Sequence, residues 1–206
     1  MNNKDVLLER ISAHVFSRGN LKFTMDKIAS ELKISKKTIY KHFPTKHDLL
    51  DAIMFPRINF IKNQIAEIIN SNKNFVEKCY LISEVLINSL QFADKLVSEL
   101  AAMGDEWWNK IDKIRMRILN KNIKILLTEG IKEGYIIDRD VVILSKIYIS
   151  AITSVINPTF SSKVKTSPGK LIEITLEVLF QGLFTEKGRK YFKKLKKEKL
   201  NKGKIK

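Results

Sequence analysis

The chain contains little cysteine, histidine, glycine or proline, and each shortage excludes a class of protein. The single cysteine, Cys79, cannot form an internal disulfide, and the 3 histidines form no cluster spaced to bind a metal ion. Only 8 glycines and 4 prolines in 206 residues disfavour a turn-rich β-sandwich. Long apolar runs are also missing: Lys146 interrupts the most apolar stretch, residues 141–156, and the N-terminus is charged too early for a signal peptide. We therefore expect a protein of the reducing cytoplasm with no metal, no cofactor and no membrane span.

The remaining composition is that of a helical globular protein. Apolar residues make up 44% of the chain, enough to bury a core. They recur at helical spacing, with no internal repeat and no alternation that would require a sheet. The pattern predicts an all-α fold with helices over residues 4–17, 25–32, 36–43, 45–68, 75–92, 95–103, 107–133, 139–156 and 169–184.

Positive charge is concentrated at the two ends of the chain. Residues 1–46 carry 10 Lys or Arg against 4 Asp or Glu, residues 47–186 carry 17 against 17, and residues 187–206 carry 11 against 1. Basic ends are typical of a polyanion binder, because each cation near a phosphate releases a counterion. A biased coding composition would explain surplus lysine equally well. The division predicts a basic domain at 1–46, a neutral domain at 47–186, and a basic tail at 187–206 that could be helical in its first turns but has too little apolar content to fold alone.

Two short helices separated by a tight turn indicate a helix-turn-helix motif. Thr24 stands where it can cap the helix over 25–32, and Ser35 can cap the helix over 36–43 after a turn of about three residues. In this motif the second helix enters the major groove of DNA by its N-terminal residues. Three residues in its first turn could therefore bind phosphate or base edges: Lys36, Lys37 and Thr38.

The residues of this motif resemble the TetR (tetracycline-repressor-like) family of transcriptional regulators. The similarity runs from Thr24 to Leu50 and includes the string Thr-Ile-Tyr-x-His-Phe-x-x-Lys-x-x-Leu-Leu at residues 38–50. Lys33 stands at a turn position where the family often has glycine. The resemblance implies that residues 1–46 form the DNA-binding domain and that residues 47–186 form the ligand-binding and dimerisation domain. The molecule would then be cytoplasmic and associated with the bacterial nucleoid.

The resemblance also implies a set of DNA contacts. Thr24, Tyr40 and Lys46 would contact the phosphate backbone, and the residues at or near the groove would be Lys36, Lys37, Thr38, Lys41 and His42. The presence of Thr24, Tyr40 and Lys46 at these positions can also be explained by structure alone. Thr24 can be only a helix cap, Tyr40 a half-buried aromatic, and Lys46 a solvated lysine.

A dimer surface is expected, because one recognition helix reads too little sequence for useful specificity. The helices over 139–156 and 169–184 are apolar almost all round, so each needs cover on two sides. We predict that these helices pair with their copies in a second chain, through Ile147, Ala151, Val155, Leu171, Ile174, Val178 and Leu179. The alternative is a large monomeric core.

A ligand pocket is expected between the connector helix over 45–68 and the helices that follow. Its candidate lining residues are aromatic or polar: Phe60, Tyr80, Glu84, Met103, Trp107, Trp108, Arg115 and Tyr148. Each of them is as well explained by an ordinary core position. Pro56 inside the connector predicts a kink, which could take part in signalling or be a static bend or a break into two helices.

The sequence favours a regulator over an enzyme. His14, His42 and His47 are scattered and unaccompanied, and no nucleophile or phosphate loop stands at a useful spacing. The predicted function is a repressor that binds a palindromic operator in double-stranded DNA as a homodimer and is released by an unknown small molecule. One alternative is a structural or protein-binding factor of the same fold, anchored on DNA. Another is a cationic protein that binds membrane surfaces through its tail.

Overall fold

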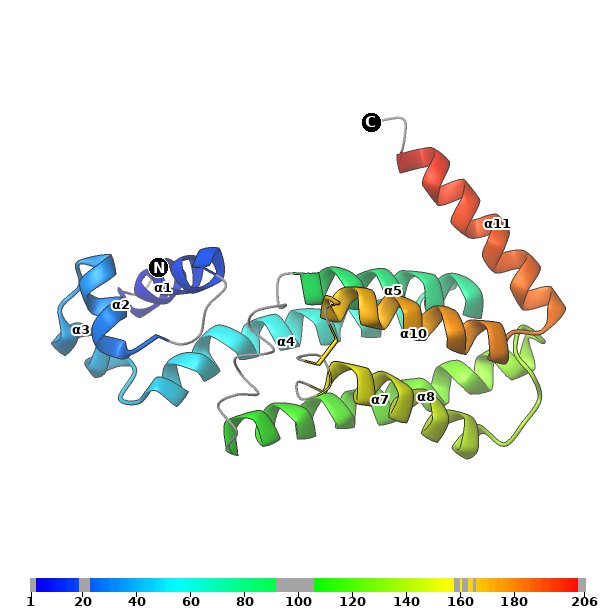
Figure 1. Cartoon of the computed structure of the whole chain (residues 1–206), viewed down its shortest axis with the longest axis horizontal. Coiled ribbons are helices and arrows are strands. Elements are labelled where there is room, and N and C mark those ends of the chain that lie inside the picture. Colours follow the sequence, from blue (N-terminus) through cyan, green and yellow to red (C-terminus); the bar gives the residue numbers. More distant parts are fainter. Residues whose placement is uncertain are drawn as a thin grey trace.

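The computed structural model is an elongated all-α molecule with a small helical head at one end and a helical body behind it (Figure 1). The structure describes residues 3–18, 23–91, 106–157, 160, 163–164 and 166–203. No helix within these ranges is both long and apolar enough to cross a membrane. The expected helix over 95–103 lies outside the described residues. The helices found are α1 (Asn3–Arg18), α2 (Met25–Leu32), α3 (Lys36–His42), α4 (Lys46–Asn70), α5 (Phe75–Gln91), α7 (Glu106–Lys132), α8 (Val141–Ile156), α10 (Pro168–Leu183) and α11 (Glu186–Gly203).

The head consists of α1, α2, α3 and the first turns of α4. Ile11, Ile39 and Phe43 are almost completely buried at its centre, together with Leu49 from α4. Together these residues form the core of the head, and one polar contact adds to it. The Nε2 atom of His14 lies 2.7 Å from a carboxylate oxygen of Glu31 and joins α1 to α2, so the expectation that His14 is unaccompanied was wrong.

Helix α4 connects the head to the body and begins with a capping box. The hydroxyl of Thr45 accepts from the backbone N–H of Asp48, whose carboxylate accepts from the backbone N–H of Thr45. Hydrogen bonds from the Thr45 side chain and then its backbone lower the pKa of Asp48. The helix continues through Pro56 to Asn70, so Pro56 does not break it into two helices.

A second connection between head and body comes from the start of α7. Lys110 Nζ lies 2.6 Å from a carboxylate oxygen of Asp51 on α4 and 4.8 Å from the ring centroid of Phe55. The neighbouring Ile111 packs against the core of the head. The orientation of the head is therefore held by side chains from two helices of the body.

The body packs α5, α7, α8, α10 and the second half of α4 around one apolar core. One internal void in it measures only about 20 Å³ and is lined by Cys79, Tyr148 and surrounding apolar residues. Burial raises the pKa of both the Cys79 thiol and the Tyr148 hydroxyl. An ion pair between the buried Lys78 and the half-buried Glu129 joins α5 to α7 at 2.6 Å.

The C-terminal residues differ from the expected tail, because α11 is helical from Glu186 to Gly203. Its first turns are anchored on the body. The ring of Tyr191 lies 5.6 Å from that of Tyr135, and the backbone N–H of Gly188 donates to the hydroxyl of Thr185. Phe192 packs against the body core. Beyond these contacts α11 leaves the body at the end far from the head (Figure 1).

Gly188 is the tightest point of the α11 anchor. A Cβ atom there would lie 2.2 Å from the backbone oxygen of Tyr135, whereas a Cβ at Gly182 would meet nothing within 4 Å. We expect Gly188→Ala to destabilise the protein by about 2 kcal/mol, because backbone cannot move aside as a flexible side chain can. Gly182→Ala is the matched control and should not lower stability. Urea unfolding followed by circular dichroism measures both, and equal midpoints for the two variants would contradict the anchor.

Candidate nucleic-acid interface

The turn between α2 and α3 is made tight by a lysine in a left-handed conformation. Lys33 has φ 52° and ψ 46°, and it is the only non-glycine residue with positive φ within the described ranges. Its backbone N–H donates to the carbonyl of Ser30, and the N–H of Ile34 donates to that of Ala29. The family often has glycine at this position, which adopts the same conformation without crowding at Cβ. The helix-turn-helix geometry is present despite the substitution.

The N-terminus of α3 carries the charged and hydroxyl groups that the sequence predicted. The Ser35 hydroxyl accepts from the backbone N–H of Thr38 at 3.0 Å, and the two hydroxyl oxygens lie 2.7 Å apart. Lys36 Nζ lies 2.6 Å from a carboxylate oxygen of Asp26, and both side chains are solvent-exposed. Lys37 and Lys41 are exposed as well. The helix forms the outer end of the head (Figure 1), where a duplex can approach it.

The remaining predicted contact residues surround α3. Tyr40 exposes 44% of its surface although it sits between the buried residues Ile39 and Phe43. Thr24 accepts from the backbone N–H of Lys27 at 3.1 Å, so it caps α2. The ammonium group of Lys46 lies 4.9 Å from the ring centroid of Phe23. Capping occupies the acceptor of Thr24 but leaves its hydroxyl proton free to bind phosphate.

His42 lies at the C-terminal end of α3, away from the first turn. It is half-buried, and its ring is tilted against that of Phe43 at 6.5 Å between centroids. The His42 side chain therefore packs partly against the core of the head.

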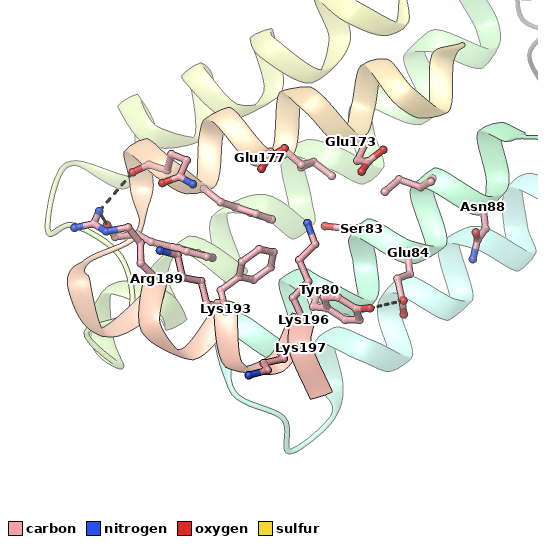
Figure 2. A pocket seen from close by; sticks show the side chains of 16 residues that line it. Tyr80, Ser83, Glu84, Asn88, Glu173, Glu177, Arg189, Lys193, Lys196 and Lys197 are labelled. Carbon is pink, nitrogen blue, oxygen red and sulfur yellow. Dashed lines mark hydrogen bonds between the residues drawn. The ribbon is translucent and has the colours of Figure 1, made fainter. Parts of the chain in front are cut away.

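The predicted pocket residues do not come together in one cavity. Tyr80 and Glu84 line an open cleft of about 660 Å³ between α5, α10 and α11 (Figure 2), whereas Tyr148 lines the internal void. Phe60 exposes 62% of its surface and lines neither cavity, and Arg115 pairs with Asp112 on α7. The side chains of Met103, Trp107 and Trp108 lie outside what the structure describes.

The cleft includes residues that the sequence analysis did not single out. Most of its charged residues come from α11, and no sequence signal indicated that this segment packs beside α5 and α10. Only the adjacent aromatics at 191–192 could have indicated that the segment has a buried side.

An apolar face remains uncovered on α8 and α10. Val178 exposes 65% of its surface and Ile143 exposes 60%, and Ile147, Ile174 and Val142 are also exposed. The other predicted interface residues are half-buried: Ala151, Leu171, Val155 and Leu179. Of these, Val155 and Leu179 pack against the body core. Because α8 and α10 pack side by side, the exposed residues form one face.

Comparison with known proteins agrees with this geometry. Residues 12–53 match the family model described as bacterial regulatory proteins, tetR family. The nucleoid occlusion factor SlmA of Idiomarina loihiensis is 23% identical over 194 residues, which cover 89% of this chain and 96% of that protein. The uncharacterized HTH-type transcriptional regulator YvaF of Bacillus subtilis is 25% identical over 85% of this chain and 94% of its own length.

Solved structures share the fold along most of the chain. A transcriptional regulator from Cytophaga hutchinsonii has a TM-score of 0.68 at 15% identity, covering 89% of this chain and 100% of that one. The regulator FadR from Bacillus subtilis, in complex with stearoyl-CoA, has a TM-score of 0.62 at 22% identity, covering 85% of this chain and 97% of that one. Residues 12–53 therefore carry the DNA-binding domain of the TetR family of bacterial regulatory proteins. The rest of the chain shares the fold of the regulators compared above.

The left-handed conformation of Lys33 has a measurable cost. A side chain in this region is disfavoured by about 1 kcal/mol relative to glycine, so Lys33→Gly should stabilise the protein by about that amount. The same replacement at Lys62, an exposed position inside α4, should destabilise it by about 1 kcal/mol, because glycine is a poor helix former. Thermal unfolding of both variants measures the difference, and a loss of stability in both would show that Lys33 is unstrained.

Proposed function

We propose that the protein is a repressor that binds an inverted-repeat operator as a homodimer and is released by a small molecule. The observation that carries this proposal is the N-terminus of α3, which is basic, capped by Ser35 and exposed at the outer end of the head. Free backbone N–H groups and lysines at such a position attract phosphate and place side chains against base edges. This location on DNA would make the protein cytoplasmic and nucleoid-associated.

The proposed contacts divide into two kinds. Tyr40, Lys46 and Thr24 would hold the phosphate backbone, and the first turn of α3 would enter the groove with Lys37 and Thr38. Lys36 pairs with Asp26 in the free protein, so it would exchange that partner for DNA on binding. Lys41 and His42 lie further along α3, at the edge of the proposed interface.

The uncovered face on α8 and α10 supports the proposed homodimer. Large apolar side chains exposed together on adjacent helices mark an interaction site, and a second copy of the same two helices would cover them by two-fold symmetry. The proposed division of the chain then gives residues 1–46 to DNA and 47–186 to dimerisation and ligand binding.

A signal between the domains would pass through the two connections at the head. Helix α4 runs from the head into the body, and Lys110 of α7 holds Asp51 of α4. A ligand that moves α7 or bends α4 near Pro56 would therefore change the position of α3. In a dimer this changes the spacing of two recognition helices, which must match half-sites about 34–36 Å apart.

The relatives support a second candidate function, because several of them carry the name nucleoid occlusion factor SlmA. In this alternative the protein is a DNA-anchored factor that does not switch promoters. Mapping its binding sites on the chromosome separates the two. Sites upstream of genes favour the repressor, and sites spread without regard to promoters favour the alternative.

A substitution that places a charge in the exposed apolar face of α8 and α10 tests the dimer. Val178→Glu should convert the protein to a monomer and weaken operator binding by about a hundredfold or more, because the two heads no longer bind as one unit. Ile125→Glu is the matched control, an exposed apolar residue on α7. Sedimentation velocity and a binding titration measure the two effects, and a dimeric Val178→Glu protein would place the interface elsewhere.

The backbone contacts are tested by the salt dependence of binding. Lys46→Ala should weaken binding to operator and to random duplex alike and should reduce the slope of log K against log[salt] by about one. Lys73→Ala, in the loop between α4 and α5, should leave both unchanged. An unchanged slope in Lys46→Ala would remove this residue from the interface.

A further inference from the structure

The cleft between α5, α10 and α11 is a second candidate binding site at a distance from the head. It has a volume of about 660 Å³, which is in the range of small-molecule sites, whereas the internal void of about 20 Å³ has no room for such a ligand. Residues of all three helices line it (Figure 2).

The base of the cleft is a cluster of aromatic rings. Phe180 and Phe184 stack with their centroids 4.9 Å apart, and Phe192 of α11 lies 5.3 and 5.5 Å from them. Tyr80 of α5 adds a fourth ring, 6.4 Å from Phe192. Phe180 and Phe184 are buried in the body core and pack against Phe192, whereas Tyr80 and Phe192 are half-buried, so their rings suit the apolar part of a ligand.

The α11 wall of the cleft is strongly basic. Lys193, Lys196 and Lys197 line it, and within the residues that the structure describes none of them forms an ion pair. Arg189 lies beside them and donates to the backbone carbonyl of Phe184. Figure 2 shows Lys193 and Lys196 on the α11 side of the cleft, together with Arg189.

The opposite walls carry carboxylates, two of which already have partners. Glu84 accepts a hydrogen bond from the Tyr80 hydroxyl at 2.7 Å, and Glu173 pairs with Lys170 at 2.8 Å. Burial and the hydrogen bond to Glu84 raise the pKa of Tyr80 to about 12, so this hydroxyl remains a neutral donor. Glu177 is the third carboxylate. The positive charge available to a ligand therefore exceeds the negative charge, and it is concentrated on α11.

We propose that this cleft binds an amphipathic anion, with its apolar body on the rings of Tyr80 and Phe192 and its anionic head at Lys193 and Lys196. A carboxylate, sulfate or phosphate on an aliphatic or aromatic body fits this description. DNA does not, because its phosphates have no apolar group to place on the aromatic rings.

The same helices connect the cleft to the rest of the protein. Glu173 and Glu177 of α10 line the cleft, while Ile174 and Val178 of the same helix belong to the exposed apolar face. Helix α5 packs against both α10 and α4. A ligand in the cleft thus contacts the helix proposed for dimerisation and the helix that supports the connector. Its role as the effector rests on the proposed function, but its binding does not.

Calorimetric titration of the full chain with monomeric dodecanoate tests the site. We expect dodecanoate to bind with one molecule per chain, and dodecyltrimethylammonium, which has the same chain length and the opposite charge, not to bind. The double variant Lys193→Glu/Lys196→Glu should weaken dodecanoate binding by about tenfold, since each reversal replaces an attraction with a repulsion. Lys199→Glu, on the same helix outside the cleft, is the matched control.

A second variant tests the apolar part of the cleft without changing charge. Ser83→Trp places a large ring among the lining residues and should abolish binding, with the thermal unfolding of the free protein confirming that the variant folds. Equal binding of the cationic amphiphile, or unchanged affinity in both the double variant and Ser83→Trp, would overturn the proposal. So would binding to anionic phospholipid vesicles with none to monomeric dodecanoate, because a bilayer surface does not enter the cleft. If dodecanoate binds as expected but leaves operator affinity unchanged, the cleft remains a binding site, and its assignment as the effector site is wrong.

Discussion

The burial of Ile39 and Phe43 in the head core fixes the position of helix α3. Helix α3 has only 7 residues, too few to be stable alone in water, so its position is set by tertiary packing. Full burial of one such side chain contributes about 1.5–3 kcal/mol. These two residues face inward against α1, α2 and Leu49 of α4, and the positions between them leave Tyr40 and Lys41 on the outside. The same packing that stabilises the head therefore presents the residues proposed to contact DNA.

Helix α10 of the body also combines several roles, because its three faces have different surroundings. Ile172, Leu176 and Phe180 are buried in the core. The exposed apolar residues lie on a second face, and the carboxylates of the cleft lie on a third. A change on one of these faces moves the other two, since a helix moves as a rigid element. Together with the contact of α5 with α4, this arrangement provides a physical connection from the cleft to the head.

The sequence predicted the elements whose signal is local. The caps at Thr24 and Ser35 follow from hydrogen-bonding side chains placed just before each helix, and both are present. The conformation of Lys33 could not be predicted, because only the packing of α2 on α3 forces a lysine into the left-handed region. The ion pair of Lys110 with Asp51 joins residues 59 positions apart in the sequence, and no periodicity reports such a contact.

Helix α11 was missed because its lysines masked a short apolar side at Tyr191 and Phe192 that is stable only against the body. The exposed face on α8 and α10 was visible as an excess of apolar residues, although Val142 and Ile143 were not assigned to it.

In the proposed function, α3 reads a duplex and the molecule presents two copies of this helix. The most direct measurement is repeated selection of bound fragments from a pool of random duplexes, at moderate ionic strength, with the full-length protein. We expect enrichment of an inverted repeat whose half-site centres are separated by about one helical turn or a multiple of it. Fragments that share no inverted repeat, bound no more tightly than random competitor, would contradict it.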